Sequence, residues 1–210
     1  MMKAPSLGNA VSFGTLRLSI LHSVYEPAED SFLLATYASS LSGSILEVGC
    51  GSGIVSLSAA QANPQNAVLG VDINPAAVKC SGANAAANGI ANATFLKSDL
   101  FSGIPAAQKF DCILFNPPYL PTSRKERLLS PEENAAYDGG ASGLNVFKRF
   151  IADAPARLAK GGKVAVIATS LGNGVEKTLA LLDARVGSAQ ILAEEKFFFE
   201  KLALIEAKRR

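Results

Sequence analysis

Short apolar runs alternate with longer, helix-like segments along most of this chain, and this alternation is the strongest constraint on its fold. The apolar runs predict strands at residues 44–46, 67–71, 94–97, 112–115 and 164–168. The helix-like segments cover residues 29–41, 54–62, 75–88, 143–159 and 175–183, and several end at a Gly or an Asn-Pro pair. This order predicts an α/β fold with a doubly wound, mainly parallel sheet and helices on both faces. Residues 189–207 instead predict an antiparallel C-terminal hairpin that turns near residues 197–199.

Composition is consistent with one domain. The chain has 210 residues, of which 49% are hydrophobic, so we expect a single domain over residues 1–210 with 1–43 preceding its first strand. The net charge of +2 is too small to predict a dedicated nucleic-acid surface. Three scattered cysteines without metal-ligand spacing favour a reducing cytoplasm and no metal site. The chain has no long apolar run, so we expect no membrane segment.

Polar residues stand at the ends of four successive predicted strands: Glu47, Asp72, Asp99 and Asn116. Ligands of doubly wound sheets bind outside the carboxyl ends of the strands. This agreement indicates a ligand site at that edge of the sheet more strongly than any single motif does.

A glycine-rich turn, Glu47-Val48-Gly49-Cys50-Gly51-Ser52-Gly53, joins the first of these strands to a helix. Such a turn lets the backbone approach a nucleotide-like ligand closely. Its third glycine comes one residue earlier than in the dinucleotide-binding pattern, and Ile54 occupies that pattern's last position. This spacing, with an acid before the glycines, favours S-adenosylmethionine (SAM), which has a cationic end. An ordinary tight turn is the alternative.

Two acids are candidates for the nucleoside part of SAM. Asp72 lies nineteen residues after Gly53, close to the spacing of about 20 expected of an acid that binds ribose hydroxyls. Asp72 also precedes Asn74-Pro75, a predicted helix start, so a capping role is the alternative. Asp99 is placed to accept the adenine amino group, with Leu100 beside the ring. Because a lone Asp after a strand is commonly a turn residue, this assignment depends on the others.

The turn Asn116-Pro117-Pro118-Tyr119 suits the binding of a planar NH2 group. The side chain of Asn116 offers a carbonyl acceptor, and Pro117 keeps its backbone carbonyl as a second one. The two prolines stiffen the turn before substrate arrives, and Tyr119 supplies an aromatic wall. The alternative is a proline-rich strand exit without a binding role.

Together these motifs resemble those of class I SAM-dependent methyltransferases, specifically the HemK-like release-factor glutamine methyltransferases, over nearly the whole chain. The resemblance implies a seven-stranded, Rossmann-like sheet. Residues 24–32 resemble the opening of the short archaeal and eukaryotic branch, and residues 136–143 resemble the loop after the substrate clamp. That opening implies an N-terminal cap over the SAM pocket within residues 1–43. The residues implied in SAM binding are Glu29, Ser31, Glu47, Gly49, Gly51, Gly53, Asp72, Asp99, Leu100 and Asn116.

The resemblance implies that Asn116, Pro117, Pro118 and Tyr119 clamp a glutamine side chain, with Asn116, Pro117 and Tyr119 acting in catalysis. The implied activity is SAM-dependent N5-methylation of glutamine in the Gly-Gly-Gln loop of a translation release factor. Two other functions remain open. The same clamp suits the amino group of adenine, as in adenine-N6 methyltransferases of DNA or RNA, although these flip the base and commonly carry an added recognition region. A non-catalytic SAM-binding subunit would not need the clamp. Protein lysine also stays open as a further substrate.

The chain differs from the bacterial members of this family. They carry an extra helical domain before the SAM domain, whereas only forty-three residues precede the first predicted strand here. The resemblance also implies a small zinc-binding activator subunit. If the sheet has the usual methyltransferase order, the strand at 94–97 lies at an edge, and an exposed edge can accept a strand from another chain.

Overall fold

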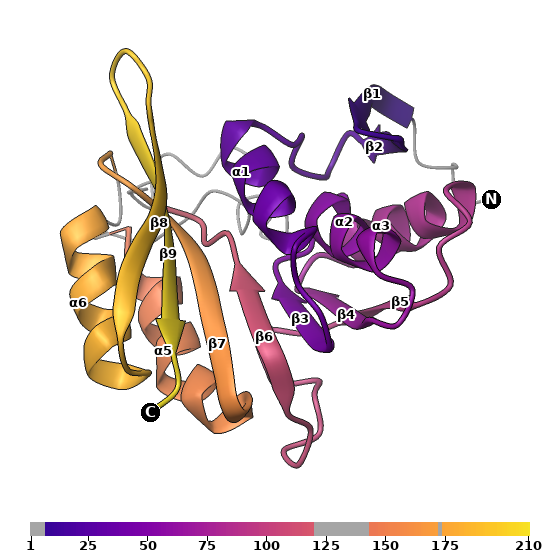
Figure 1. Ribbon diagram of the computed structural model, residues 1–210. Helices are drawn as coiled ribbons and strands as arrows, with labels where there is room; N and C mark the ends of the chain where they lie inside the picture. The colour runs from indigo at the N-terminus through magenta and orange to yellow at the C-terminus, as the bar shows by residue number, and fades with distance from the viewer. Residues whose placement is uncertain (1–6, 120–142, 172–173) are drawn as a thin grey trace.

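The computed structural model describes residues 7–119, 143–171 and 174–210. It contains a seven-stranded sheet in the order β5-β4-β3-β6-β7-β9-β8 (Figure 1). Its first five strands along the chain pair in parallel, and β9 pairs antiparallel with both β7 and β8. The predicted doubly wound sheet with an antiparallel C-terminal hairpin is therefore confirmed. The strands are β3 (Ser44–Val48), β4 (Ala67–Asp72), β5 (Ala93–Lys97), β6 (Phe110–Phe115), β7 (Leu158–Thr169), β8 (Ala189–Lys196) and β9 (Lys201–Lys208).

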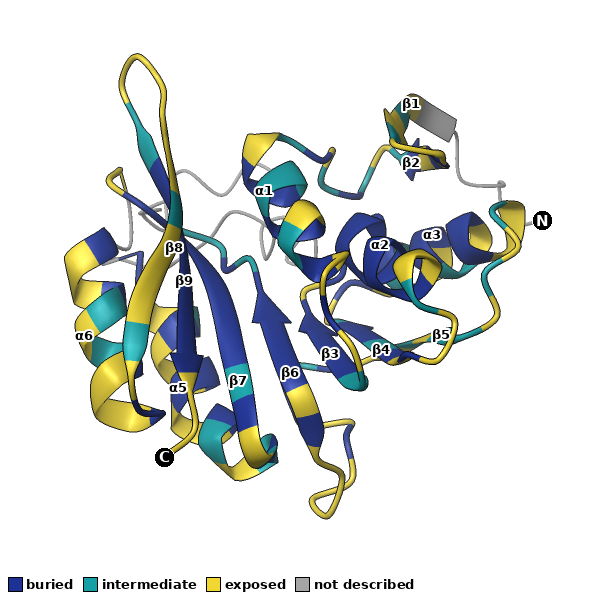
Figure 2. Cartoon of the chain, in the orientation of Figure 1, coloured by how far each residue is buried: buried dark blue, intermediate teal, exposed yellow. Residues whose placement is uncertain are grey.

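Helices cover both faces of the sheet. One face packs against α1 (Glu29–Ala38), α2 (Ile54–Ala62) and α3 (Pro75–Ala87), and the other packs against α5 (Asn145–Arg157) and α6 (Val175–Arg185). The central strands β6 and β7 are largely buried, whereas the edge strands β5 and β8 expose many residues (Figure 2).

The strand that precedes Asn116 is anchored by aromatic packing. Phe115 ends β6, and its ring centroid lies 4.6 Å from that of Phe150 in α5. Phe150 also stacks on Phe101 at 5.5 Å, and all three rings are buried. Burial of each such side chain stabilises the fold by about 1.5–3 kcal/mol. The turn after β6 therefore starts from a fixed point in the core.

Helix α1 is tied to the sheet by a polar contact. The hydroxyl of Tyr37 donates to Glu206 of β9, whose carboxylate also lies 3.0 Å from the Lys163 ammonium group. Although burial acts to raise it, the pKa of Glu206 is held below its usual value by these two partners. The contact helps to fix the position of α1, whose first turn reaches the candidate site.

An N-terminal hairpin was missed by the sequence analysis, which placed the first strand at residue 44. β1 (Leu7–Phe13) and β2 (Leu16–Leu21) pair antiparallel as a separate two-stranded sheet. Alternate residues of β2 are buried in the core beneath it. Two amide side chains, from Asn84 of α3 and from Asn88 directly after that helix, accept hydrogen bonds from the backbone of β2. Packing against α3 thus stabilises a hairpin that is too short to be stable alone.

The prediction that Gly161-Gly162 ends a helix was also wrong. Helix α5 ends at Arg157, and both glycines lie within β7. The pairing of β6 with β7 shifts at this point, opposite Asp111. Gly161 has φ = 73°, and a Cβ on Gly162 would lie 3.0 Å from the carbonyl oxygen of Phe110. The glycines therefore serve a strand irregularity rather than a helix end.

No helix in the described ranges is long and apolar enough to cross a membrane.

Candidate functional site

Asp30 is the centre of a hydrogen-bond network between α1 and the turn after β6. It lies in the first turn of α1 and is only 3% exposed. Its carboxylate accepts from Asn116 Nδ2 at 2.9 Å and from the hydroxyls of Tyr25 and Tyr119 at 3.3 Å. The backbone N–H and the hydroxyl of Ser31 also donate to it, at 2.6 and 3.1 Å. The cap segment and the predicted clamp are thus joined through one buried carboxylate.

Sequence reasoning did not single out Asp30, although it named Glu29 and Ser31 on either side. Acids are ordinary in the first turn of a helix, because they interact favourably with its N-terminus. Two sequence signals pointed to it: Asp30 lies within the 24–32 motif, and it follows Glu29 directly as a second acid.

The contact with Asp30 sets the orientation of the Asn116 side chain. A carboxylate only accepts hydrogen bonds, so the Asn116 amide must turn its NH2 group toward Asp30. Its Oδ1 then faces away, and this atom is buried without a hydrogen-bond partner among the described residues. A buried acceptor without a donor is uncommon in folded proteins. The site therefore presents an acceptor that is ready for an N–H group from outside the described chain.

A pocket of about 180 Å³ lies beside this network. Asp30 and Tyr119 line it, together with Glu29 from α1 and Phe197 and Glu200 from the β8–β9 hairpin. Burial, followed by the nearby Asp30 carboxylate, raises the pKa of Tyr119, so its phenol stays neutral and can donate. Pro117 is buried in the clamp and Pro118 is half-buried.

The glycine-rich turn adopts backbone conformations that suit glycine. Gly49, Gly51 and Gly53 have φ values of 71°, 52° and 87°. The N–H groups of Gly49 and Cys50 donate to the carbonyl of Val71, which fixes the turn against β4. A Cβ built on Gly51 would meet no atom within 4 Å, so open space adjoins the backbone here. This open space beside a fixed turn fits the close approach of a nucleotide-like cofactor.

Asp72 stands beside the glycine-rich turn. Its carboxylate accepts from the Gly51 N–H at 3.0 Å and from the Asn74 N–H at 2.8 Å. Burial raises its pKa. Asn74 caps α3 by accepting from the Ala76 N–H, as predicted. Asp72 therefore organises both the turn and the capping loop, and each carboxylate oxygen keeps further acceptor capacity.

Glu47 lies beneath the turn rather than in the open space. It is 3% exposed and accepts hydrogen bonds from the backbone N–H and the hydroxyl of Ser56 in α2. Burial raises its pKa to about 8, although the bonds from Ser56 act in the opposite direction. The side chain joins β3 to α2 and shapes the start of the glycine-rich turn.

The raised pKa of Glu47 predicts a dependence of stability on pH. Between pH 4.5 and about 8, the folded protein keeps a proton on Glu47 that the unfolded chain releases. The free energy of unfolding therefore falls as pH rises through this window, by up to about 1.4 kcal/mol per pH unit from this group. We expect Glu47→Gln to remove this component. Denaturant unfolding of both proteins at a series of pH values measures the difference, and parallel curves would contradict it.

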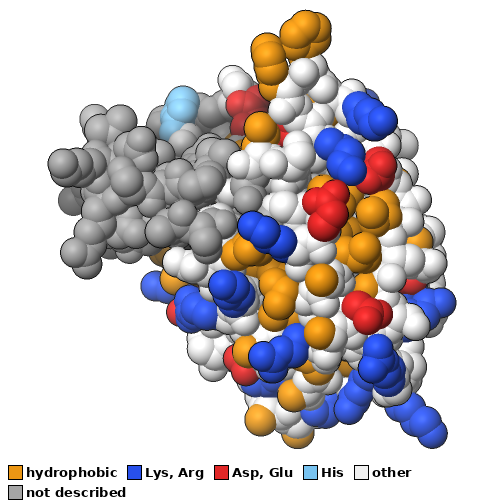
Figure 3. Space-filling model, turned by 90° about the vertical axis from the view of Figure 1, so that its left-hand side faces the viewer, with side chains coloured by type: hydrophobic (Ala, Val, Ile, Leu, Met, Phe, Trp, Pro, Cys, Tyr) orange, Lys and Arg blue, Asp and Glu red, His pale blue; other side chains and the backbone are white. Residues whose placement is uncertain are grey.

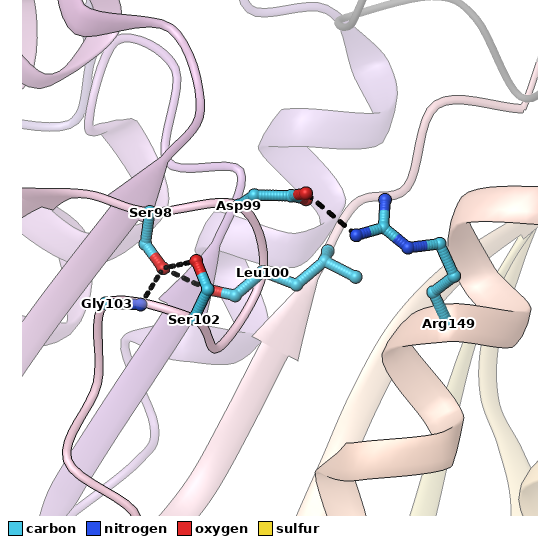
Figure 4. Close-up of polar contacts among 6 residues, drawn as sticks. All are labelled: Ser98, Asp99, Leu100, Ser102, Gly103 and Arg149. Carbon is cyan, nitrogen blue, oxygen red and sulfur yellow. Dashed lines mark hydrogen bonds and ion pairs between the residues drawn. The ribbon is translucent and has the colours of Figure 1, made fainter.

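Asp99 forms an ion pair that sequence reasoning did not predict. Its carboxylate lies 2.8 Å from the guanidinium of Arg149 in α5, and the two side chains point toward one another (Figure 4). Both side chains are about half exposed, and an exposed pair of this kind contributes only about 0–1 kcal/mol. Asp99 therefore remains accessible to a ligand, with Arg149 as an additional neighbour.

Leu100 has an unusual backbone conformation for a residue other than glycine. Its φ of 51° is positive, which is uncommon outside glycine. The hydroxyl of Ser98 holds the turn by donating to the Leu100 carbonyl and accepting from the Gly103 N–H (Figure 4). The Leu100 side chain is 9% exposed and belongs to the core. Strain of this kind is found most often at binding sites.

The structure covers two of the sequence predictions only in part: the loop at residues 136–143 and the metal-ligand groups. Residues 136–142 of the loop that resembles the post-clamp segment are outside the described residues. No group of His, Cys, Asp and Glu that could hold a metal occurs in the part of the chain that the structure describes. Cys50, Cys80 and Cys112 are free and buried.

Comparison with known proteins identifies similar sequences. Residues 28–130 match the model of the methyltransferase small domain. A "Putative protein N5-glutamine methyltransferase" of Methanocaldococcus jannaschii is 42% identical, and the match covers 92% of this chain and 96% of that protein. Methyltransferase HEMK2 of Homo sapiens is 36% identical, with 77% and 78% covered. A release factor glutamine methyltransferase of Geobacter sulfurreducens is 35% identical, and the match covers 68% of this chain but only 50% of that protein.

Solved structures show the same fold. The Thermus thermophilus 16S rRNA N2 G1207 methyltransferase, in complex with AdoMet and guanosine, superposes with a TM-score of 0.75 and 26% identity. The match covers 98% of this chain and 52% of that one. AdoMet is SAM, so a structural relative binds the cofactor that the glycine-rich turn predicts.

Proposed function

Because this chain belongs to the HemK-like class I SAM-dependent methyltransferases, we propose that it methylates the side-chain nitrogen N5 of a protein glutamine in the Gly-Gly-Gln loop of a translation release factor. The names of its relatives support this substrate, since they include both N5-glutamine and release factor glutamine methyltransferases.

One observation carries the proposal: the Oδ1 of Asn116 is buried without a hydrogen-bond partner among the described residues. A glutamine side chain ends in an NH2 group with two hydrogens to donate. Asn116 Oδ1 would accept one of them, and the carbonyl of Pro117 is the candidate for the other. Asp30 fixes Asn116 from behind through the 2.9 Å contact. The acceptor is thus oriented before the substrate binds, which lowers the entropic cost of reaching the reactive geometry.

SAM is the cofactor, and when bound it supplies an electrophilic methyl group. The glycine-rich turn would hold its amino-acid end, Asp72 its ribose hydroxyls, and Asp99 with Leu100 its adenine. Glu29, which lines the pocket, and the cap segment around Ser31 would close the site from the side of α1. Glu47 would act indirectly, because its side chain is committed to Ser56.

The residues of the clamp would act by orientation and electrostatics. A carboxamide nitrogen is a weak nucleophile because its lone pair is delocalised. Two acceptors on its hydrogens would aim this nitrogen at the methyl group and favour the positive charge that develops there. Tyr119, which stays neutral, would supply a wall and keep the pocket poor in water. As the nitrogen–methyl bond forms and the sulfur–methyl bond breaks, the nitrogen would release one of its two protons past its acceptor to solvent, so this scheme requires no dedicated general base.

The cofactor assignment predicts an effect of Asp72→Ala. We expect SAM affinity to fall by about 1–3 kcal/mol, because charge-assisted hydrogen bonds to the ribose are lost. Titration calorimetry with SAM measures the affinity, and thermal unfolding checks that the glycine-rich turn has not collapsed. Asp183→Ala, at an exposed site in α6, serves as the control. Unchanged affinity in Asp72→Ala would remove Asp72 from the binding site.

Adenine-N6 methylation of DNA or RNA is the competing function, since the same acceptors suit an adenine amino group. One relative is a ribosomal RNA small subunit methyltransferase C of Yersinia enterocolitica, 32% identical, but this match covers only 41% of that protein. The match to the Methanocaldococcus jannaschii relative covers 96%. The glutamine substrate is therefore the better supported of the two.

We also propose that the edge strand β5 pairs with a small zinc-binding activator subunit. β5 is the first strand in the sheet order, and three of its five residues are exposed: Thr94, Leu96 and Lys97. The exposed fraction of Leu96 is 39%. An open edge of this kind invites strand addition from a partner. Co-expression with the activator is expected to give a heterodimer that binds SAM more tightly than the chain alone.

Leu96→Asp is expected to weaken this heterodimer. Leu192→Asp is the matched control, since Leu192 is similarly exposed at 42% but lies on β8 at the opposite edge. Full SAM binding and activity of the purified chain, with no gain on adding the subunit, would contradict a need for the partner.

A further inference from the structure

Three consecutive phenylalanines form the exposed end of the β8–β9 hairpin, and we call Phe197–Phe199 the phenylalanine tip. Their exposed fractions are 41%, 94% and 82%. The hairpin extends past the end of the sheet (Figure 1), and hydrophobic side chains protrude at the top of the molecule in the view of Figure 3. Large aromatic side chains clustered in solvent commonly belong to an interaction site.

The phenylalanine tip is a structured turn. The N–H of Phe197 donates to the carbonyl of Glu200 at 2.7 Å, and the rings of Phe198 and Phe199 pack edge to face with centroids 4.9 Å apart. Its base is joined to the end of β7, where Ser170 and Lys201 exchange two hydrogen bonds of 3.0 Å. The hydroxyl of Thr169 also donates to Glu200. These contacts hold the exposed rings in a defined place relative to the sheet.

The phenylalanine tip adjoins the candidate active site. Phe197 and Glu200 line the same pocket as Asp30 and Tyr119, and Asp30 in turn contacts the clamp residue Asn116. A polypeptide loop that placed its glutamine in the clamp would bring the surface around that loop toward Phe198 and Phe199. The tip is thus continuous with the proposed substrate site.

We propose that the phenylalanine tip docks on an apolar patch of the substrate protein, beside the loop that carries the methylated glutamine. This inference rests on the proposed function. The charge of the hairpin disfavours nucleic acid and anionic membranes, since residues 194–201 hold three glutamates and two lysines, a net charge of −1. The sheet order also separates the tip from the proposed activator, because β8 and β5 are the two opposite edges.

The test compares two forms of one substrate. Methylation kinetics are measured for wild type and for the double variant Phe198→Ser/Phe199→Ser, first with the full-length release factor and then with a short peptide of its Gly-Gly-Gln loop. We expect the double variant to raise KM for the full-length protein by about tenfold or more, as loss of aromatic contact residues does at interfaces. Its kcat, its kinetics with the peptide and its SAM affinity should stay at wild-type values.

Leu192→Ser is the matched control, because it removes an exposed apolar side chain of β8 outside the tip. It should leave both KM values unchanged. An unchanged KM of the double variant for the full-length protein would overturn docking while leaving the proposed function intact. An equal loss with the peptide would also overturn it, since the tip would then act inside the pocket.

Two further outcomes would assign the tip elsewhere. Wild-type binding to vesicles of phosphatidylserine and phosphatidylcholine that the double variant loses would indicate a membrane contact and overturn the inference. A wild-type dimer that becomes a monomer in the double variant would indicate a second copy as the occupant. If the wild type methylated neither glutamine substrate, the proposed function would fail, and the docking inference would fail with it.

Discussion

Replacement of Asn116 by Ala is expected to lower turnover of a Gly-Gly-Gln substrate by about a hundredfold or more, the loss found when one oriented polar group is removed from an active site. The variant loses the Oδ1 acceptor, which is the buried atom without a partner among the described residues. Without it, one amide hydrogen of the substrate has no acceptor and the nitrogen is no longer aimed. SAM affinity should remain nearly intact, because in the proposed clamp Asn116 would mainly contact the amide to be methylated.

Single-turnover methyl transfer and titration calorimetry measure the two quantities separately. Tyr119→Phe is a suitable comparison, because it keeps the aromatic wall and removes the hydroxyl that contacts Asp30 at 3.3 Å. Its turnover should fall much less than that of Asn116→Ala. Wild-type turnover in Asn116→Ala would mean that Asn116 is only a turn residue and that the clamp is wrongly assigned.

Asp30→Asn should lower turnover by about tenfold to a hundredfold, the effect of disturbing the supporting contacts of a catalytic group. Asn at position 30 has nearly the same shape but can offer an NH2 group where Asp30 only accepts. The Asn116 amide, which now donates to Asp30 at 2.9 Å, could then turn over and present its own NH2 group to the substrate. We therefore classify Asp30 as a positioning residue.

A double-mutant cycle separates positioning from a general loss of structure. In the Asn116→Ala background, Asp30→Asn should cost little further activity, because the side chain that it orients is gone. Thermal unfolding of each variant checks that the fold is retained. Additive losses would contradict the positioning role and assign Asp30 an independent function.

The sequence predicted the sheet because its information is local and periodic. Apolar runs identified the parallel strands, and parallel strands bring their carboxyl ends to one edge. Glu47, Asp72, Asp99 and Asn116 could therefore be placed at one edge of the sheet without knowledge of any contact. The directions of the side chains could not be placed in the same way. Glu47 points beneath the glycine-rich turn toward Ser56, whereas Asn116 points toward Asp30.

The features that the sequence analysis missed depend on contacts between distant segments. Asp30 resembles an ordinary helix-start acid, and its role appears only when Asn116, 86 residues later, lies beside it. Arg149 likewise reaches Asp99 across 50 residues. The N-terminal hairpin is stabilised by α3 rather than by its own propensity. Glycine is common both after helix ends and at strand irregularities, so Gly161-Gly162 alone could not distinguish the two.

In the proposed function, the clamp positions a protein glutamine for methylation. The most direct test of this function is to incubate the protein with isotopically labelled SAM and a full-length translation release factor, and to locate the label by tandem mass spectrometry. We expect one methyl group on the glutamine of the Gly-Gly-Gln loop, and no label when Asn116→Ala replaces the wild type. Label on a lysine, on adenine of added nucleic acid, or on no substrate at all would contradict this expectation.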